Sequence, residues 1–346
     1  MVQPLRVGLV GYGYAGATIH APLITAVDGL HLVRVASSQP EKVKLRGIEH
    51  TADATQLIEA PDLDLIVIAT PNTTHFGLAR QALLAGKHVV VEKPFTVTSA
   101  EGEELLQLAR TQKRVLSVFH NRRWDSDFLT ARHCIESGLL GGINTYHVHF
   151  DRYRPQVRNR WREQNLPGSG GLYDLGSHLI DQALLLFGRP RTVRAEIAIQ
   201  RPNGPAADYF HLQLSYGSLK VVLHSGSLVR EPGPRFQIHG SRGTFIKSGF
   251  DPQEEALKQG RQPNEEGWGR EDATNAGSLL TERDGLTLSG PIATLPGDYP
   301  AFYRGMRDAI REGLAAPVSA CDALQVIRVI ELSLASERER RVMPFS

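Results

Sequence analysis

The sequence predicts an α/β protein with two domains: an N-terminal doubly wound parallel sheet in residues 1–121, and a C-terminal α+β domain with a large, mostly antiparallel, open-faced sheet in residues 122–346. Two observations support this prediction. Up to residue 121, short apolar runs alternate with helical patterns, which is typical of a parallel sheet with right-handed crossovers. After residue 121 the hydrophobic period changes to two, which is typical of antiparallel strands that bury one face.

Composition and charge exclude several classes of partner. The net charge is +2 and no basic stripe is present, so we expect no nucleic-acid partner. No apolar run approaches the length of a membrane span, and the N-terminus lacks a signal-peptide pattern. The two cysteines, Cys134 and Cys321, are interpreted as small hydrophobic residues in a reducing compartment, and no Cys/His cluster indicates a metal site. We therefore expect a cytoplasmic protein without a membrane or metal partner.

The first predicted strand, residues 5–10, ends in a glycine-rich turn. The turn reads Gly11-Tyr12-Gly13-Tyr14-Ala15-Gly16, opens a helical segment and precedes a second strand at 32–36. This context indicates a dinucleotide fingerprint, in which backbone N–H groups at a helix start hold a pyrophosphate. Pro22 is expected to interrupt the helix after His20.

The end of the second strand bears on the choice of cofactor. An acidic residue at this position normally binds the adenosine ribose. Here the strand ends in Ser37, Ser38 and Gln39, and Lys42 follows. Because small hydroxyls and a lysine suit a 2′-phosphate, we predict NADP; Glu41 could still take the acidic role, which keeps NAD as the alternative.

Two later loops leave the carboxyl ends of buried strands, where open α/β sheets place their ligands. The first follows the strand at 65–69 and the second follows the strand at 88–91. Asn72 and His75 could instead cap the helix at 76–85. Further elements are a strand at 48–51, helices at 53–59 and 98–110, and a strand at 115–119. The predicted cofactor contacts in the two loops are Thr70, Pro71, Asn72, His75, Glu92 and Lys93.

The second domain is predicted to begin with a helix at 127–136 and to close with helices at 301–312 and 322–338. Gly217-Ser218 and residues 241–243 are interpreted as hairpin connections, and the strand alternation implies one face against helices and another free for a partner subunit. Residues 251–291 are expected to be irregular, as a lid, an arm or a long loop. The predicted strands are 144–153, 192–200, 210–216, 219–229, 235–240 and 244–247.

The stretch from Gly168 to Asp181 indicates chemistry. Asp174 and His178 are four residues apart on a predicted helix, so both project from one face, and a carboxylate with an imidazole can exchange a proton with a bound hydroxyl. Gly176 lies between them. A glycine inside a helix costs about 1 kcal/mol relative to alanine, so its presence indicates that something packs closely over this turn.

Three motifs in this order, Gly11–Gly16, Glu92-Lys93-Pro94 and Asp174–His178, resemble the Gfo/Idh/MocA oxidoreductases over the whole chain. His120–Phe128 and Phe150–Glu163 are similar to the NADP-dependent scyllo-inositol dehydrogenase branch, although Gln39 stands where that branch often has arginine. The resemblance implies a Rossmann domain, a sheet domain, and homodimers or homotetramers formed through the sheet. It also implies catalytic roles for Lys93, Asp174 and His178.

The expected function is hydride transfer between NADP and a secondary alcohol of a cyclic polyol such as scyllo-inositol. An aldose or keto-sugar substrate is the alternative, and a cofactor-binding protein without turnover is a third possibility. The arginines that alternate from Arg152 to Arg162 leave open an acidic or phosphorylated substrate, or simply a solvated basic loop. The predicted substrate-binding residues are Asn121, Arg122, Arg154, Asn159 and Trp161.

Overall fold

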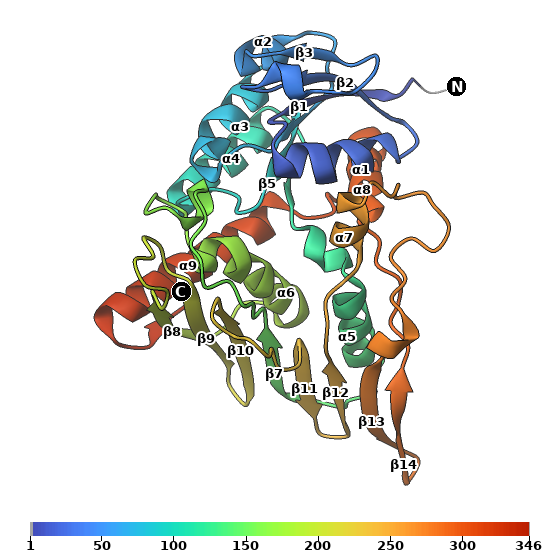
Figure 1. Ribbon diagram of the computed structural model, residues 1–346, viewed down its shortest axis with the longest axis vertical. Coiled ribbons are helices and arrows are strands. Elements are labelled where there is room, and N and C mark those ends of the chain that lie inside the picture. The colour runs from blue at the N-terminus through green and yellow to red at the C-terminus, as the bar shows by residue number, and fades with distance from the viewer. Residues whose placement is uncertain (1–2, 346) are drawn as a thin grey trace. The chain divides into compact units, whose positions relative to one another are not determined.

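The computed structural model describes residues 3–345, which form two compact units (Figure 1). The first unit contains the chain up to Asn121 together with residues 253–268 and 298–324; the second contains residues 122–252, 269–297 and the chain from Gln325 onward. The predicted division placed everything after residue 121 in the second domain. In the structure, two later segments lie in the first unit instead, because their contacts are with that unit.

The first unit is built on a parallel sheet of six strands in the order β3-β2-β1-β4-β5-β6. All its neighbouring strands pair in parallel, which confirms the predicted doubly wound fold. The central strand β4 is completely buried, as its apolar sequence requires. The strands are β1 Leu5–Val10, β2 Leu30–Ala36, β3 Glu49–Thr51, β4 Leu65–Ile68, β5 His88–Glu92 and β6 Leu116–Phe119.

Local signals explain where the helices of this unit begin. Asp53 caps α2 by accepting from two backbone N–H groups, and Thr98 and Glu101 form the predicted capping box of α4. A π-helical segment, Ala15–His20, passes without a break into α1, so the predicted interruption after His20 is wrong: Pro22 stands in the first turn of α1, where a proline needs no backbone donor. The helices are α1 Ala21–Thr25, α2 Ala54–Glu59, α3 His75–Leu84, α4 Ser99–Thr111, α7 Gln253–Lys258 and α8 Pro300–Glu312.

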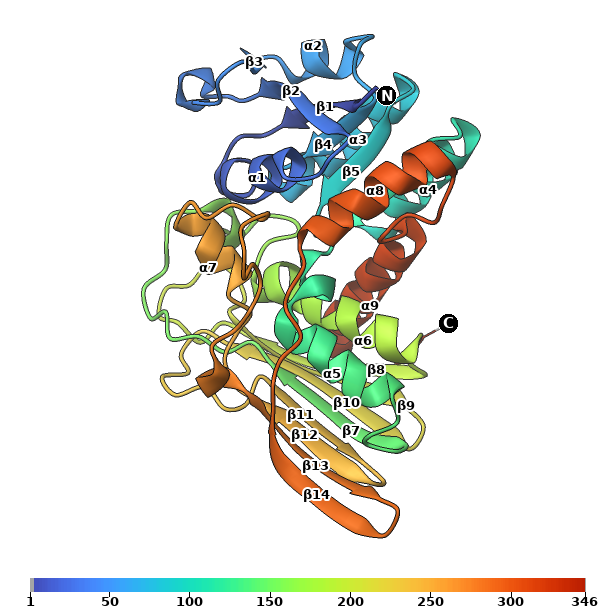
Figure 2. The same ribbon diagram turned by 90° about the vertical axis from the view of Figure 1, so that its right-hand side faces the viewer.

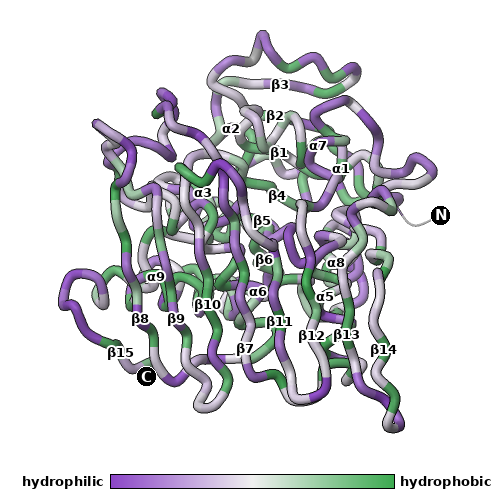
Figure 3. Tube along the Cα trace, turned by 60° about the horizontal axis from the view of Figure 1, so that its bottom comes forward, coloured by the Kyte–Doolittle hydropathy of each residue, from purple (hydrophilic) through white to green (hydrophobic). Residues whose placement is uncertain are grey.

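The second unit contains a sheet of nine strands in the order β14-β13-β12-β11-β7-β10-β9-β8-β15 (Figure 3). Its neighbours pair antiparallel except β7 and β10, which are parallel. The mostly antiparallel architecture confirms the prediction. The strands are β7 Ile143–His149, β8 Thr192–Ala198, β9 Tyr209–Tyr216, β10 Leu219–Gly226, β11 Phe236–Gly240, β12 Gly243–Lys247, β13 Gly277–Arg283, β14 Leu286–Ile292 and β15 Met343–Pro344.

The prediction that residues 251–291 are irregular is wrong. This region contains α7 and the edge hairpin of β13 and β14, which turns at Asp284 and Gly285 with positive φ angles at both. Almost every side chain of β14 is exposed, and Gly290 and Pro291 break the short apolar–polar alternation that begins at Leu286. The Asp-Gly pair was the one local signal of a tight hairpin.

Helices cover one face of the nine-stranded sheet. They are α5 Ser126–Glu136, α6 Ser177–Phe187 and, from Gln325 onward, α9 Ala320–Glu339, and Figure 2 shows α5 and α6 over the same side of the strands. On β7, Tyr146 and Val148 are buried toward the helices, whereas His147 and His149 are partly exposed on the opposite side. We call this opposite side the open face. Among residues 3–345, no helix has both the length and the apolar character needed to cross a membrane.

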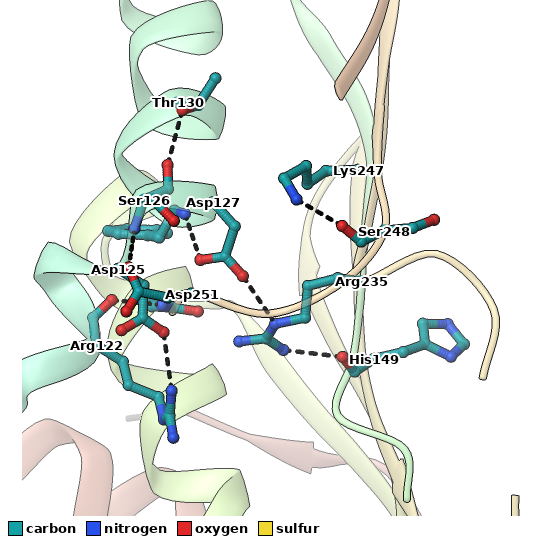
Figure 4. A network of polar contacts seen from close by, with 12 residues as sticks. Arg122, Asp125, Ser126, Asp127, Thr130, His149, Arg235, Lys247, Ser248 and Asp251 are labelled. Carbon is teal, nitrogen blue, oxygen red and sulfur yellow. Dashed lines mark hydrogen bonds and ion pairs between the residues drawn. The ribbon is translucent and has the colours of Figure 1, made fainter. Parts of the chain in front are cut away.

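A buried polar network ties the start of α5 to the sheet (Figure 4). The Arg235 Nε atom lies 3.4 Å from an Asp127 carboxylate oxygen, and its Nη1 donates to the His149 main-chain carbonyl at 2.9 Å. Asp251 accepts a hydrogen bond from the Ser126 N–H at 2.7 Å. Burial lowers the pKa of Arg235, and the negative charge of Asp127 opposes that effect. The charges of Arg235 and Asp127 therefore compensate each other within the core, and loss of either side chain would leave the other as an unpaired buried charge.

Candidate active site

The glycine-rich turn of the first unit is closely packed except at one position. A Cβ atom at Gly11, whose φ is +99°, would lie 2.5 Å from the Ala69 carbonyl oxygen, and one at Gly16 would lie 2.0 Å from the Gly11 carbonyl oxygen. Neither position can take a side chain without moving backbone. A Cβ at Gly13 would meet nothing within 4 Å. The open backbone at Gly13 fits the approach of a dinucleotide pyrophosphate.

The remaining residues of the turn, Tyr12, Tyr14 and Ala15, lie beside this open backbone in the sequence. Burial raises the pKa of the Tyr12 hydroxyl, which therefore stays protonated and can donate. Tyr14 is half exposed, and its hydroxyl donates to Glu254 of α7 at 2.7 Å. This hydrogen bond is one of the contacts that hold residues 253–268 in the first unit. Ala15 begins the π-helical segment directly after the turn.

No acidic side chain is held at the tip of β2. The Ser37 hydroxyl accepts from the Gln39 N–H at 3.1 Å, and Ser38 and Lys42 are exposed. Glu41 is also exposed, in the short 3₁₀ turn that ends at Lys42. The predicted 2′-phosphate contacts are thus all accessible to a ligand.

His75 joins the two loops that leave β4 and β5. Its imidazole is buried, with Nδ1 2.9 Å from the Pro94 carbonyl oxygen and Nε2 3.0 Å from the Thr70 carbonyl oxygen. Burial lowers the pKa of His75, although both carbonyls act in the opposite direction. The ring therefore has a positioning role between the loops. Asn72 is also buried, whereas Pro71 is exposed.

A second buried chain of polar groups reaches the Lys93 backbone. Tyr303 of α8 contacts His20 Nδ1 at 2.5 Å, His20 Nε2 lies 3.0 Å from one Glu92 oxygen, and the other oxygen accepts from the Lys93 N–H at 2.9 Å. Burial and the charge of Glu92 raise the pKa of Tyr303 well above its usual value, so its hydroxyl remains a donor. Glu92 is buried, and its bond to the Lys93 N–H orients the Lys93 backbone. Lys93 is half buried and precedes the cis-proline Pro94.

In the second unit, Asp174 lies in a π-helical segment, Leu172–Gly176, that runs directly into α6. Such segments are frequent at functional sites. His178 is buried in the first turn of α6, and Asp174 is partly exposed with an oxygen 3.3 Å from Arg162 Nε. The close neighbour of Gly176 is Leu172, since a Cβ at Gly176 would lie 2.8 Å from its Cδ1 atom, whereas the ring of Phe210 on β9 lies at an ordinary contact distance of 3.5 Å.

Further along α6, Asp181 is buried and forms a two-point ion pair with Arg123. The Arg123 Nε and Nη2 atoms donate to the two Asp181 oxygens at 2.8 and 2.6 Å. Asp181 therefore holds the start of the second unit against α6 and is not a free acid on the helix surface.

A pocket within the second unit is lined by five arginines and three acidic residues. Arg201 pairs with Glu163 at 2.8 Å and with Asp208 at 2.7 Å, and Glu163 also accepts from Arg160 at 2.6 Å. Burial lowers the pKa of Arg154, and the charges of neighbouring arginines add to this effect. The pocket therefore has an excess of positive potential. The charged lining residues are Arg152, Arg154, Arg160, Arg162, Arg201, Glu163, Asp174 and Asp208.

The predicted substrate-binding residues fall into two groups. Arg154 lines this pocket together with Asp174. The other four do not: Arg122 is buried and bonded to Asp125 at 3.0 Å, Asn159 is exposed, and the Trp161 ring lies 4.6 Å under the Arg162 guanidinium. Asn121 is buried at the end of the first unit's opening segment.

Several site residues escaped the sequence analysis. His20 and Tyr303 have partners 72 and 283 positions away. Arg201 bridges Glu163, 38 positions away, and Asp208, seven positions away, and none of these spacings indicates a regular element. Glu163 directly follows the arginine-rich stretch, and an acid at that place was the available signal of an anchoring role.

Comparison with known proteins gives matches to two family descriptions. Residues 5–120 match the "Oxidoreductase family, NAD-binding Rossmann fold", and residues 132–345 match the "Oxidoreductase family, C-terminal alpha/beta domain", both of the Gfo/Idh/MocA type. These two matches together span nearly all of the described residues.

Full-length relatives are similar over both units. The chain is 47% identical to the uncharacterized oxidoreductase YdgJ of Escherichia coli over 99% of both chains. It is 43% identical to the scyllo-inositol 2-dehydrogenase (NADP(+)) IolW of Bacillus subtilis, over 99% of this chain and 96% of that protein. The solved structure of Bacillus subtilis yvaA matches with a TM-score of 0.97 at 42% identity, over 100% of this chain and 99% of the other.

Proposed function

Because the chain belongs to the Gfo/Idh/MocA oxidoreductase family, we propose that it transfers a hydride between NADP and a secondary alcohol of a cyclic polyol, with scyllo-inositol as the first candidate. The observation that favours this function most is the position of Asp174, in the wall of an arginine-lined pocket and one turn before the buried imidazole of His178. Hydroxyl-rich ligands suit such a lining, because guanidinium groups donate several hydrogen bonds in a fixed geometry.

The first unit is an NAD(P)-binding Rossmann domain, and the residues of its glycine turn fit that cofactor. The hydride chemistry belongs to the nicotinamide, and the chain supplies binding and orientation. Backbone N–H groups of the turn after Gly11 hold the pyrophosphate, since the Gly11 N–H itself donates to the Ala36 carbonyl. For the 2′-phosphate of NADP we assign Ser37, Ser38 and Lys42, which are available at the tip of β2; the relative IolW is named for NADP(+).

Three side chains are assigned to the reaction. His178 takes the proton of the reacting hydroxyl, because an imidazole is the side chain best matched to proton transfer near neutral pH. Asp174 orients the substrate or the imidazole from the preceding turn. Lys93 donates to the reacting oxygen and stabilises the charge that develops there. The bonds from Glu92 and His75 fix the loop that carries Lys93.

A second candidate substrate carries an acidic group, such as a sugar acid or a phosphorylated sugar. The excess of arginine over acid in the pocket and the lowered pKa of Arg154 favour it, because an anion would compensate charges that now repel one another. Aldoses and keto-sugars are the remaining candidate substrates, and they would undergo the same hydride transfer.

A substrate panel tests the proposal. Reduction of NADP⁺ and of NAD⁺ should be followed by nicotinamide absorbance with inositols, aldoses, sugar acids and sugar phosphates. Turnover with scyllo-inositol and a higher kcat/KM with NADP⁺ would support the first candidate, and turnover confined to acidic sugars would support the second. Cofactor binding without turnover of any substrate or of the matching ketones would contradict an enzymatic function.

The open face also favours assembly. Polar and aromatic side chains on β7, β9 and β10 are only partly exposed there, and the sheet is broad enough for a symmetric contact between two chains. We therefore propose a homodimer or homotetramer that forms through this face. Light scattering that returns the mass of one chain at micromolar concentration would contradict it.

A further inference from the structure

We propose that His149, Asp151 and His224 form a binding site for a divalent transition-metal ion of the Zn²⁺ class on the open face of the second unit's sheet. The side chains are held by strand pairing, since β7 and β10 are parallel neighbours and His149 is the direct partner of His224 in their register. Asp151 follows His149 by two residues and therefore points to the same side.

The distances among the three groups suit a metal ion. Asp151 has one oxygen 3.3 Å from His149 Nδ1 and the other 3.3 Å from His224 Nε2, and the three ligand atoms lie within 4.8 Å of one another. Ligands bound tetrahedrally at about 2.0–2.1 Å are separated by roughly 3.3 Å. Because the two 3.3 Å contacts involve different Asp151 oxygens, the side chains would move closer together around one ion. A tight hydrogen bond between charged groups would be shorter, at about 2.7–2.9 Å.

The ligands are also oriented as a metal site requires. The Asp151 carboxylate is buried, and the Gly226 N–H donates to one of its oxygens at 2.9 Å, which fixes its direction. Figure 4 shows the His149 ring directed away from Arg235, whose guanidinium contacts the main-chain carbonyl of the same residue. His149 is thus held through its backbone on one side while its imidazole points to the open face.

Charge favours a cation at this position. The buried Asp151 carboxylate carries a negative charge, and a divalent ion bound between it and the two imidazoles would offset that charge. Two nitrogen ligands and one carboxylate select zinc and its first-row neighbours over Mg²⁺ and Ca²⁺, which prefer oxygen. Three protein ligands leave a fourth position for water or another donor.

The sequence alone did not indicate this site, because 73 residues separate Asp151 from His224 and only the pairing of β7 with β10 brings them together. The inference is independent of the proposed oxidoreductase activity, and its test measures binding only.

Titration of the full-length, tag-free, chelator-treated chain with Zn²⁺ tests the proposal by calorimetry, and Co²⁺ serves as a coloured substitute. We expect saturable binding of one ion per chain, a visible Co²⁺ spectrum of tetrahedral intensity, and no comparable response to Mg²⁺. His149→Ala and His224→Ala should each weaken Zn²⁺ binding by at least the roughly 10–100-fold cost of losing an outer-shell partner.

Two further variants make the result specific. Asp151→Asn keeps the acceptor for the Gly226 N–H but removes the charge, so it should weaken binding in a chain that still folds, as circular dichroism would show. His239→Ala removes an exposed histidine of the same face whose ring lies beside Thr244, and it should leave binding unchanged. Absence of saturable Zn²⁺ binding to the wild-type chain would overturn the proposal. So would equal affinity in the His149, Asp151 and His224 variants, or an equal loss in the His239 variant.

Discussion

The glycine turn allows one prediction in which two similar substitutions have opposite effects. In Gly16→Ala the new methyl group would lie 2.0 Å from the Gly11 carbonyl oxygen, so the backbone must move by more than 1 Å to restore an ordinary contact. Gly11 is itself anchored, because its N–H donates to the Ala36 carbonyl at 2.8 Å. Overpacking of this kind costs about 1–3 kcal/mol or more. We expect a clear loss of stability before any cofactor is added.

Gly13→Ala should leave the ligand-free fold intact. The methyl group meets nothing within 4 Å, and the φ of Gly13 lies outside the left-handed region. The change should be neutral or stabilising by about 0.4–1 kcal/mol, because alanine restricts the unfolded chain. The same methyl group occupies the space through which a pyrophosphate would reach the backbone. Loss of one hydrogen bond to a charged group, about 1.5–3 kcal/mol, would raise the Kd for NADPH about 10- to 100-fold.

Two assays separate the effects. Thermal unfolding of the ligand-free variants reports stability, and titration followed by NADPH fluorescence reports affinity. An unchanged Kd in Gly13→Ala would show that the pyrophosphate does not lie against this turn. A Gly16→Ala chain as stable as the wild type would show that the close approach of Gly16 to Gly11 is wrong.

Three more predictions concern single side chains. Lys93→Ala should lower kcat by roughly a hundredfold while the Kd for NADP⁺ stays near the wild-type value, because Lys93 stabilises charge on the substrate oxygen; an unchanged kcat would remove it from the reaction. Lys42→Ala should reduce the preference for NADP⁺ over NAD⁺ in kcat/KM, and an unchanged preference would mean that another group reads the 2′-phosphate. Burial and the charge of Arg114 lower the pKa of His88 to about 4. Since the unfolded imidazole titrates near 6.5, the unfolded chain binds more protons below that pH, and stability should fall between about pH 6.5 and 4. The contribution is at most about 3 kcal/mol, and less after solvent screening, because the ring is partly exposed. Urea unfolding at several pH values should show a weaker decline in His88→Asn, and identical curves would refute the assignment.

Local patterns were sufficient for most of the first unit. The apolar run of β1, the glycine turn and the capping box at Thr98 each specify their structure through neighbours within a few residues. These features need no knowledge of distant contacts, so the sequence alone predicted them. The interruption expected at Pro22 does not occur, because the π-helical segment passes directly into α1 and Pro22 stands in its first turn, where proline is tolerated.

Features made by distant contacts could not be predicted in this way. His20 functions through Glu92 and Tyr303, which are brought to it by β5 and α8. Arg201 anchors the arginine-rich stretch only because it meets Glu163 across the second unit. Strand pairing likewise decides which polar residues share a face of the sheet. The edge strand β14 was missed for a different reason, since its short apolar–polar alternation from Leu286 is broken by Gly290 and Pro291, which are unfavourable inside strands.

The most direct test of the proposed reaction is the rate of NADPH formation from scyllo-inositol and NADP⁺, measured for the wild type and for His178→Ala at neutral pH. We predict turnover by the wild type, a kcat lower by roughly a hundredfold or more in the variant, and an NADP⁺ affinity that is nearly the same in both. A His178→Ala enzyme with near-normal kcat would contradict the assignment of His178 as the base, and a wild-type chain that forms no NADPH from scyllo-inositol would contradict the proposed substrate.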